Sequence, residues 1–287
     1  MPHATQILLQ VANGLTFGAL LFVLASGFTL IFGLMRIVNM AHGAYYILGA
    51  YIAYSVTNIE KSWLLGLAAA TVGIGALALV SYWIVKPVKG EMPQTLLTLG
   101  IGLVVGDLSL AFWGGNPKSI TAPSAISHPV VIGDFVYPGY RSFVLLVAVV
   151  IGIALWWLLQ RTQLGRVIRA GVDDRETVDA LGINIERTFT QTFVLGGLIT
   201  GFAGALGGSF MGFGPGTDLN ILTYSLVVVI IGGLGSVAGT AIGAVIVGLV
   251  DSFGRSYFSE LSIFLLSGTL ILVLAFRPQG LLGKAER

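Results

Sequence analysis

The sequence predicts an all-α, polytopic membrane protein with about eight or nine transmembrane segments, some of them glycine-broken or re-entrant. Two observations support this fold class. The chain is 55% hydrophobic and only 10% charged, whereas soluble domains carry about 25% charged residues. Its charged residues also leave long uncharged runs, most of which reach the roughly 20 residues that cross a bilayer as a helix. These runs are 4–35, 37–59, 62–85, 92–106, 142–160, 188–217, 219–250 and 261–276.

The apolar runs favour helices over a β-barrel, because barrel strands alternate in polarity and Val144–Leu159 is apolar on every face. A helix also satisfies its own backbone in lipid. Residues 1–287 are therefore expected to form a single transmembrane domain, with the first run retained as a span. Cysteine is absent, which excludes disulfides and thiol chemistry. The net charge of +2 is too small to indicate a nucleic-acid partner.

Basic residues set the expected orientation, since cytoplasmic loops are enriched in Lys and Arg. Placing the N-terminus outside assigns eleven basic residues to the cytoplasm and four to the exterior. The path then has an external loop at 114–141, a cytoplasmic loop at 161–187 and a cytoplasmic tail at 277–287. The expected spans before 219 lie near 8–33, 40–57, 63–85, 93–113, 142–160 and 188–211.

The run 219–250 requires a break, because one crossing there would place the basic tail outside. Ile231–Thr240 reads IGGLGSVAGT, and its four glycines can turn the chain within the membrane. Two arms follow, Leu222–Ile231 and Ala241–Val250, either as full spans or as a re-entrant pair. Broken helices often mark a substrate site, and Arg36–Gly43 is a possible counterpart in the first half.

The cytoplasmic loop 161–187 holds five of the fifteen basic residues and five of the thirteen acidic ones. Asp173 or Asp174 can cap a short amphipathic helix that carries Val178 and Leu181 on its apolar side, and Gly182 can end it in a left-handed conformation. Such a helix either rests in lipid headgroups or inserts into a groove of a cytoplasmic partner.

Four ordered motifs resemble one family. The pattern G-x-x-x-R-A at 165–170, followed by Ala-Leu-Gly-Ile-Asn at 180–184, is similar to the cytoplasmic loop of ABC importer permeases. Gly27–Gly49 resembles the first-half signature of branched-chain amino-acid permeases, in particular the smaller of their two homologous membrane subunits. Ile231–Ala244 and Phe276–Leu281 resemble the same family, and the four motifs run from about residue 8 to 283.

The resemblance implies a complex of two homologous permease subunits, two ABC ATPase subunits and an external solute-binding protein in the bacterial inner (plasma) membrane. ATP and Mg²⁺ would bind the ATPase subunits, with no cofactor in this chain, and the central path would open alternately to either side. The loop would couple the ATPase to the permease. Its candidate residues are Gly165, Arg169, Ala170, Asp173, Asp174, Ala180, Leu181 and Gly182.

Polar groups at membrane depth are the candidates for the translocation path, because they are costly in lipid and usually face protein or water. Asn39 and His42 lie three residues apart on one helix face, and Asp107 is an acidic residue inside a span-like run. Alternatively, the first two hydrogen-bond a neighbouring helix or lie at the cytoplasmic interface beside Arg36. Asp107 would then reach the outer interface, solvated or paired with another residue. The glycine-rich break adds Gly233, Gly235 and Ser236 as a possible gating hinge. No metal site is expected, since His3 and His128 are not at ligand spacing with His42.

An enzymatic role is not expected, since the spans contain no Ser/His, paired Asp or metal constellation. No Walker A lysine motif occurs, and Gly233–Ala238 matches a dinucleotide pattern without its βαβ context. Glycine ladders such as Gly197/Gly201 are expected to pack helices closely. Two other functions stay open: an ABC permease for urea, short amides or sugars, and an ion-coupled transporter or channel that uses Asp107 or His42.

Overall fold

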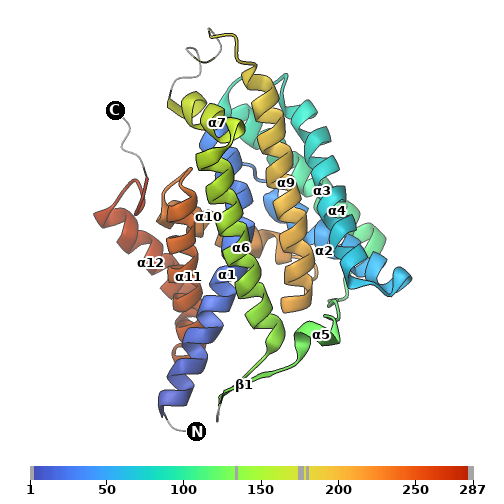
Figure 1. The fold of residues 1–287 in the computed structure, drawn as a ribbon, viewed down its shortest axis with the longest axis vertical. Helices are drawn as coiled ribbons and strands as arrows, with labels where there is room; N and C mark the ends of the chain where they lie inside the picture. The colour runs from blue at the N-terminus through green and yellow to red at the C-terminus, as the bar shows by residue number, and fades with distance from the viewer. Residues whose placement is uncertain (1–2, 133–134, 174–177, 179–180, 284–287) are drawn as a thin grey trace.

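A computed structural model describes residues 3–132, 135–173, 178 and 181–283, and it confirms the all-α fold (Figure 1). The only strands in this part of the chain form one short hairpin. The helices are α1 (His3–Met35), α2 (His42–Glu60), α3 (Trp63–Val85), α4 (Glu91–Trp113), α5 (Ser124–Ser127), α6 (Gly139–Arg161), α7 (Gln163–Asp173), α9 (Ile185–Phe210), α10 (Thr217–Gly232), α11 (Val237–Tyr257) and α12 (Ser262–Phe276), and the strands are β1 (Val130–Ile132) and β2 (Phe135–Tyr137).

Six of these helices are long and apolar enough to cross a membrane, namely α1, α3, α4, α6, α9 and α11. Helices α10 and α12 are apolar but shorter, and α2 carries several tyrosines among its apolar residues. Together these nine helices of the described chain agree with the eight or nine segments expected from the sequence.

Helix α1 lies at the centre of the bundle, with α11 and α12 to one side and α9, α2, α3 and α4 to the other (Figure 1). Its apolar window is 89% buried, whereas that of α6 is 17% buried. Glycine permits the tight packing against α11, since an added Cβ at Gly18 would lie 2.6 Å from the Ala244 carbonyl oxygen. A helix that is hydrophobic on every side can therefore be buried by protein or can face lipid. Small residues favour burial, because they let neighbouring helices approach closely.

Helices α2, α3 and α9 form a second tightly packed unit. An added Cβ at Gly204 would lie 2.2 Å from the Tyr46 carbonyl oxygen of α2, and one at Gly201 would lie 2.4 Å from the Ala70 carbonyl oxygen of α3. These are the close backbone approaches that the glycine ladder in α9 predicts.

The helical structure is interrupted between α1 and α2. After Met35 it runs back along the bundle without helix, so that His42 contacts Leu24, eleven residues before the end of α1. At about 1.5 Å per residue this places the start of α2 roughly 16 Å inside the end of α1. Thr98 of α4 supplies a hydrogen-bond partner for this non-helical backbone, because its Oγ1 accepts from Met40 N at 3.0 Å. Non-helical backbone at this depth requires such burial in protein.

The predicted break after α10 is confirmed, although both arms are longer than expected. Helix α10 begins at Thr217 and α11 ends at Tyr257. Gly233 and Gly235 turn the chain with φ values of +103° and +80°, and Ser236 caps α11 by accepting from Gly239 N at 3.1 Å. The tail covers this turn, since the amides of Leu281 and Leu282 donate to the carbonyls of Ile231 and Gly232 at 2.9 and 3.0 Å.

The segment 114–141 lies at the same end of the bundle as the N-terminus, opposite α7 (Figure 1). It contains α5 and the antiparallel β1–β2 hairpin, and α6 begins at Gly139, three residues earlier than the expected span. Lys118 pairs with Phe213 through two backbone hydrogen bonds of 2.8 Å. The segment is thereby tied to the connection between α9 and α10.

Candidate functional site

The loop 161–187 contains an amphipathic helix, α7, which precedes the helix predicted to begin at Asp173 or Asp174. Thr162 stabilises its first turn, since its Oγ1 accepts from Gly165 N at 3.1 Å. Gly165 itself is required by the tight α6–α7 corner, because a Cβ there would lie 2.3 Å from the Leu159 carbonyl oxygen. Arg169 and Ala170 lie in α7, and Asp173 is its last residue. The helix predicted to follow Asp173 falls mostly outside the described residues. The other proposed cap, Asp174, and Ala180 lie outside the described residues.

The end of the loop places its two predicted apolar residues differently. Val178 is 4% exposed, whereas Leu181 is 72% exposed, so they do not share a buried face. Gly182 has φ +77°, the left-handed conformation that the sequence predicted at this position. Leu181 and Gly182 therefore form a projecting corner between α7 and α9.

The residues on either side of this corner, Val178 and Ile185, belong to one buried apolar cluster. The cluster joins three helices: it contains Ile168 of α7, Leu34 at the end of α1, and Ile185 and Phe189 of α9, together with Val178 from the loop. A displacement of the loop would therefore be transmitted to α1 and α9 through direct side-chain packing.

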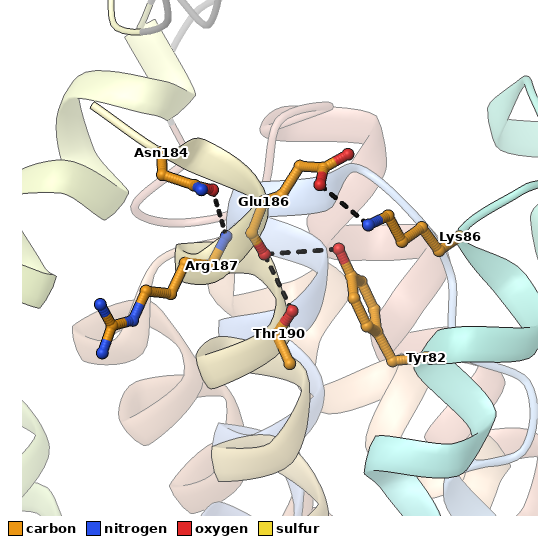
Figure 2. Close-up of polar contacts among 6 residues, drawn as sticks. All are labelled: Tyr82, Lys86, Asn184, Glu186, Arg187 and Thr190. Carbon is orange, nitrogen blue, oxygen red and sulfur yellow. Dashed lines mark hydrogen bonds and ion pairs between the residues drawn. The ribbon is translucent and has the colours of Figure 1, made fainter. Parts of the chain in front are cut away.

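Helix α9 begins in a set of polar contacts that also reaches α3 (Figure 2). Asn184 caps α9 by accepting from Arg187 N at 2.9 Å. Lys86, just after α3, forms an ion pair with Glu186 at 2.8 Å, and Tyr82 donates to the Glu186 carbonyl oxygen at 3.5 Å. We call Tyr82, Lys86 and Glu186 the α3–α9 anchor.

The ion pair of the anchor favours the charged form of the lysine. The hydrogen bond to Glu186, helped by its negative charge, raises the pKa of Lys86 above its usual value. In Figure 2 the Arg187 side chain points away from the anchor, so it is left for other contacts. The anchor could not be predicted from the sequence, because its partners lie a hundred positions apart. The only indication was that both were expected on the same side of the membrane.

Asn39 and His42 lie inside the protein rather than along a cavity. The His42 ring is fully buried, with Nε2 3.0 Å from the Leu24 carbonyl oxygen and Nδ1 3.3 Å from Thr200 Oγ1. Because a carbonyl can only accept, Nε2 carries the proton. Asn39 Oδ1 accepts from Ala41 N at 3.2 Å, while its buried Nδ2 has no partner among the described residues. Both side chains thus hold the broken segment between α1 and α2.

Asp107 lies elsewhere, on the outer surface of α4. The neighbouring side chains Leu103, Val104 and Leu108 on this face are also exposed, so the carboxylate stands in an apolar surface. Nearby is a small cleft of about 30 Å³. It is lined by Met40, Ala44, Leu99, Gly102, Leu103, Asp218, Leu219 and Leu222.

The cleft lies where α2 and α10 begin. An added Cβ at Gly43 would lie 2.1 Å from the Asp218 carbonyl oxygen, and one at Gly106 would lie 3.5 Å from Asp218 Oδ2. The first turns of α2 and α10 therefore meet α4 at the cleft, beside Gly102 and Gly106. The turn with Gly233, Gly235 and Ser236 is separate, since it packs against Gly33 at the end of α1. The structure does not bring all six predicted path residues together.

The sequence of the chain matches a family model described as the permease component of branched-chain amino acid transport systems, over residues 10–274. The chain belongs to this permease family.

The permease is similar along its whole length to curated proteins. It is 29% identical to the high-affinity branched-chain amino acid transport system permease protein BraD of Pseudomonas aeruginosa, with 100% of this chain and 99% of the relative covered. It is 28% identical to the protein LivH of Escherichia coli, with 96% of each chain covered.

A more distant relative is LivM of Escherichia coli, a permease protein of the high-affinity branched-chain amino acid transport system. It is 26% identical, with 91% of this chain and 67% of the relative covered. No solved structure matches the permease. The comparisons and the helices together make it a multi-pass membrane transport protein.

Proposed function

We propose that the permease is a membrane-spanning subunit of an ATP-driven ABC importer for branched-chain amino acids, located in the bacterial inner (plasma) membrane. Full-length similarity to BraD and LivH, whose names state branched-chain amino acid transport, supports the substrate class. The similarity to both LivH and LivM supports pairing with a second, homologous permease subunit.

The remaining partners are two ABC ATPase subunits and an external solute-binding protein. ATP and Mg²⁺ bind the ATPase subunits, and this chain contributes neither a cofactor nor covalent chemistry. One structural observation carries the coupling step: the exposed corner at Leu181 and Gly182 lies in the chain between Val178 and Ile185, which are buried in one cluster with Ile168. An ATPase subunit that binds this corner and changes conformation would move α7 and the start of α9.

Motion of α9 then reaches the membrane interior. The α3–α9 anchor and the close packing of α9 on α2 and α3 make these helices move together. Since α2 begins at the cleft beside α4, this motion changes the shape of the cleft and of the α4 face that carries Asp107. We assign this face to the translocation path, because an ionisable side chain is costly against lipid and Asp107 has no ion-pair partner among the described residues.

Reconstitution of the assembled complex tests the proposal. Leucine uptake should require ATP and the external binding protein, and Leu181→Asp should abolish uptake while the complex stays folded, because the side chain is exposed. Met92→Asp is the matched control, since Met92 is 70% exposed at the start of α4 on the same side of the bundle. Uptake by the chain alone, driven by an ion gradient without ATP, would instead establish a secondary transporter.

A further inference from the structure

The outer end of the bundle contains a second, larger cavity of about 330 Å³. This volume lies in the range of small-molecule sites, which combine an apolar lining with a few polar groups. Its apolar wall contains Phe17 of α1, Phe210 of α9 and Met211, which follows α9. Its polar side chains come from α1, α6 and α11, three helices that are far apart in the sequence.

A cation is held at one side of this cavity without an anionic partner. Arg141, in the first turn of α6, donates through Nη1 to Asn13 Oδ1, and its guanidinium lies 5.1 Å from the centre of the Phe210 ring. Tyr137 also donates to Asn13 Oδ1, at 3.2 Å. No carboxylate pairs with Arg141 in the described part of the chain. Arg141 is therefore fixed in position while most of its five N–H donors remain available to an anion.

A carboxylate lies at the other side of the cavity. Asp251 of α11 accepts from Tyr224 Oη at 2.6 Å through Oδ1 and from Arg255 Nε at 2.8 Å through Oδ2. Its side chain is only 13% exposed, while that of Arg255 is 61% exposed. A carboxylate offers about four acceptor positions, so Asp251 can accept one more donor from the cavity. Arg255 lines the cavity as well, beside its partner Asp251. The unpaired Arg141 and the Asp251–Arg255 pair thus face one partly apolar space.

We propose that this cavity is an outer binding site for a zwitterionic α-amino acid with an aliphatic side chain, its carboxylate on Arg141 and its ammonium group on Asp251. The inference rests on the proposed function and assigns it a site distinct from the α4 cleft. The apolar wall of Phe17, Phe210 and Met211 receives the aliphatic side chain. The cavity opens at the end of the bundle opposite α7, where solute from outside arrives.

Equilibrium binding of tritiated leucine tests the site, using the purified complex in nanodiscs without its external binding protein. We expect saturable binding that Arg141→Gln weakens by at least about tenfold, since a charge-assisted pair is lost. Arg141→Lys should restore part of it, because it keeps the charge but loses the planar fork. Lys118→Gln is the matched control, a cation of the same external segment that lies over Tyr54 and outside the cavity.

Substrate analogues separate the two charges. Leucinamide lacks the carboxylate, so its competition should be insensitive to Arg141→Gln, and 4-methylpentanoate lacks the ammonium group, so its competition should be insensitive to Asp251→Asn. Leucine binding that is unchanged in Arg141→Gln, or absent from the wild-type complex, would overturn the site. A phospholipid headgroup offers the same two charges. Mass spectrometry that finds a lipid bound to the wild-type complex but not to Arg141→Gln, without leucine binding, would assign the cavity to lipid.

The proposed function has a separate readout. ATP-driven leucine uptake by the complete wild-type complex does not depend on a stable outer site. Uptake that persists while the binding experiment fails removes this inference alone, whereas absence of uptake removes the proposed function as well.

Discussion

At the scale of single residues, the Lys86–Glu186 pair connects two helices through solvent-exposed charges. Such pairs contribute little to stability and are screened by salt. We expect Lys86→Gln to lower the melting temperature slightly at low salt and not at about 1 M salt, but to reduce ATP-driven uptake clearly. The double variant Lys86→Glu/Glu186→Lys should recover uptake. Equal uptake by Lys86→Gln and wild type would show that the pair does not couple α3 to α9.

The pair also predicts a pH dependence. The pKa of Lys86 is raised in the folded protein above its unfolded value of 10.5. A raised pKa stabilises the fold below the unfolded pKa, and this stabilisation disappears as the pH rises through the folded pKa. The difference in melting temperature between wild type and Lys86→Gln should therefore stay constant from pH 7 to 9 and disappear only as the pH rises through the raised pKa of Lys86. A difference that shrinks below pH 9 would contradict the assignment.

Asp107 gives a second prediction at this scale. Because its side chain is exposed on α4, Asp107→Asn should change the free energy of unfolding by less than about 0.5 kcal/mol. Uptake by the complex should nevertheless fall, since the path loses its charge. The neighbouring exposed residue Leu108 supplies a control as Leu108→Met. If Asp107→Asn transports normally, the α4 face is not the path and Asp107 serves an interface.

At the scale of helices, packing depends on glycine where two backbones meet. Gly204→Val in α9 should strongly destabilise the permease, by about 3 kcal/mol or more, because the first added atom collides with backbone of α2 rather than with a side chain that can move. Gly268→Ala in α12 is the control, since an added Cβ there has nothing within 4 Å. It should be neutral or slightly stabilising. Melting curves in detergent compare the two.

Some of the helices and turns could be predicted from sequence patterns alone. Four glycines in ten residues predicted the turn between α10 and α11, because positive φ values are accessible to glycine. Helix α7 was not predicted, because the acidic pair at 173–174 indicated a helix that begins only there. The better signal was Thr162 followed by Leu164, Val167 and Ile168, a capping residue before apolar residues at helical spacing. The break at 36–41 agrees with Arg36–Gly43 as the suggested counterpart in the first half. Its stabilisation could not be predicted, since Thr98 of α4 hydrogen-bonds Met40 N from a distant position.

At the scale of the whole molecule, the orientation can be tested directly because the chain has no cysteine. A membrane-impermeant maleimide applied to intact cells should label Ser127→Cys in the external segment and should not label Leu181→Cys in the cytoplasmic loop. Both positions are exposed, so accessibility within the protein does not differ. The reverse pattern would invert the topology, and with it the assignment of the outer cavity.

The order of the helices across the bundle could not be predicted from the sequence. Hydrophobicity does not separate a buried span from a lipid-facing one, because lipid is as apolar as a protein core. Helices α1 and α6 both read as apolar spans, yet one is central and the other peripheral. The outer cavity could not be predicted for a different reason: Asn13, Arg141 and Asp251 lie far apart in the sequence, and only the packing of α1, α6 and α11 places them around one space.

The tail that covers the turn after α10 has a consequence for biogenesis. Leu281 and Leu282 supply the amides for the carbonyls of Ile231 and Gly232, and they leave the ribosome long after α10 has entered the membrane. Until they emerge, the turn between α10 and α11 lacks these two hydrogen bonds, and membrane quality-control proteases can act on it. A chain stopped before Leu281 should therefore insert normally but be degraded faster than the full-length protein, which pulse-chase labelling would reveal.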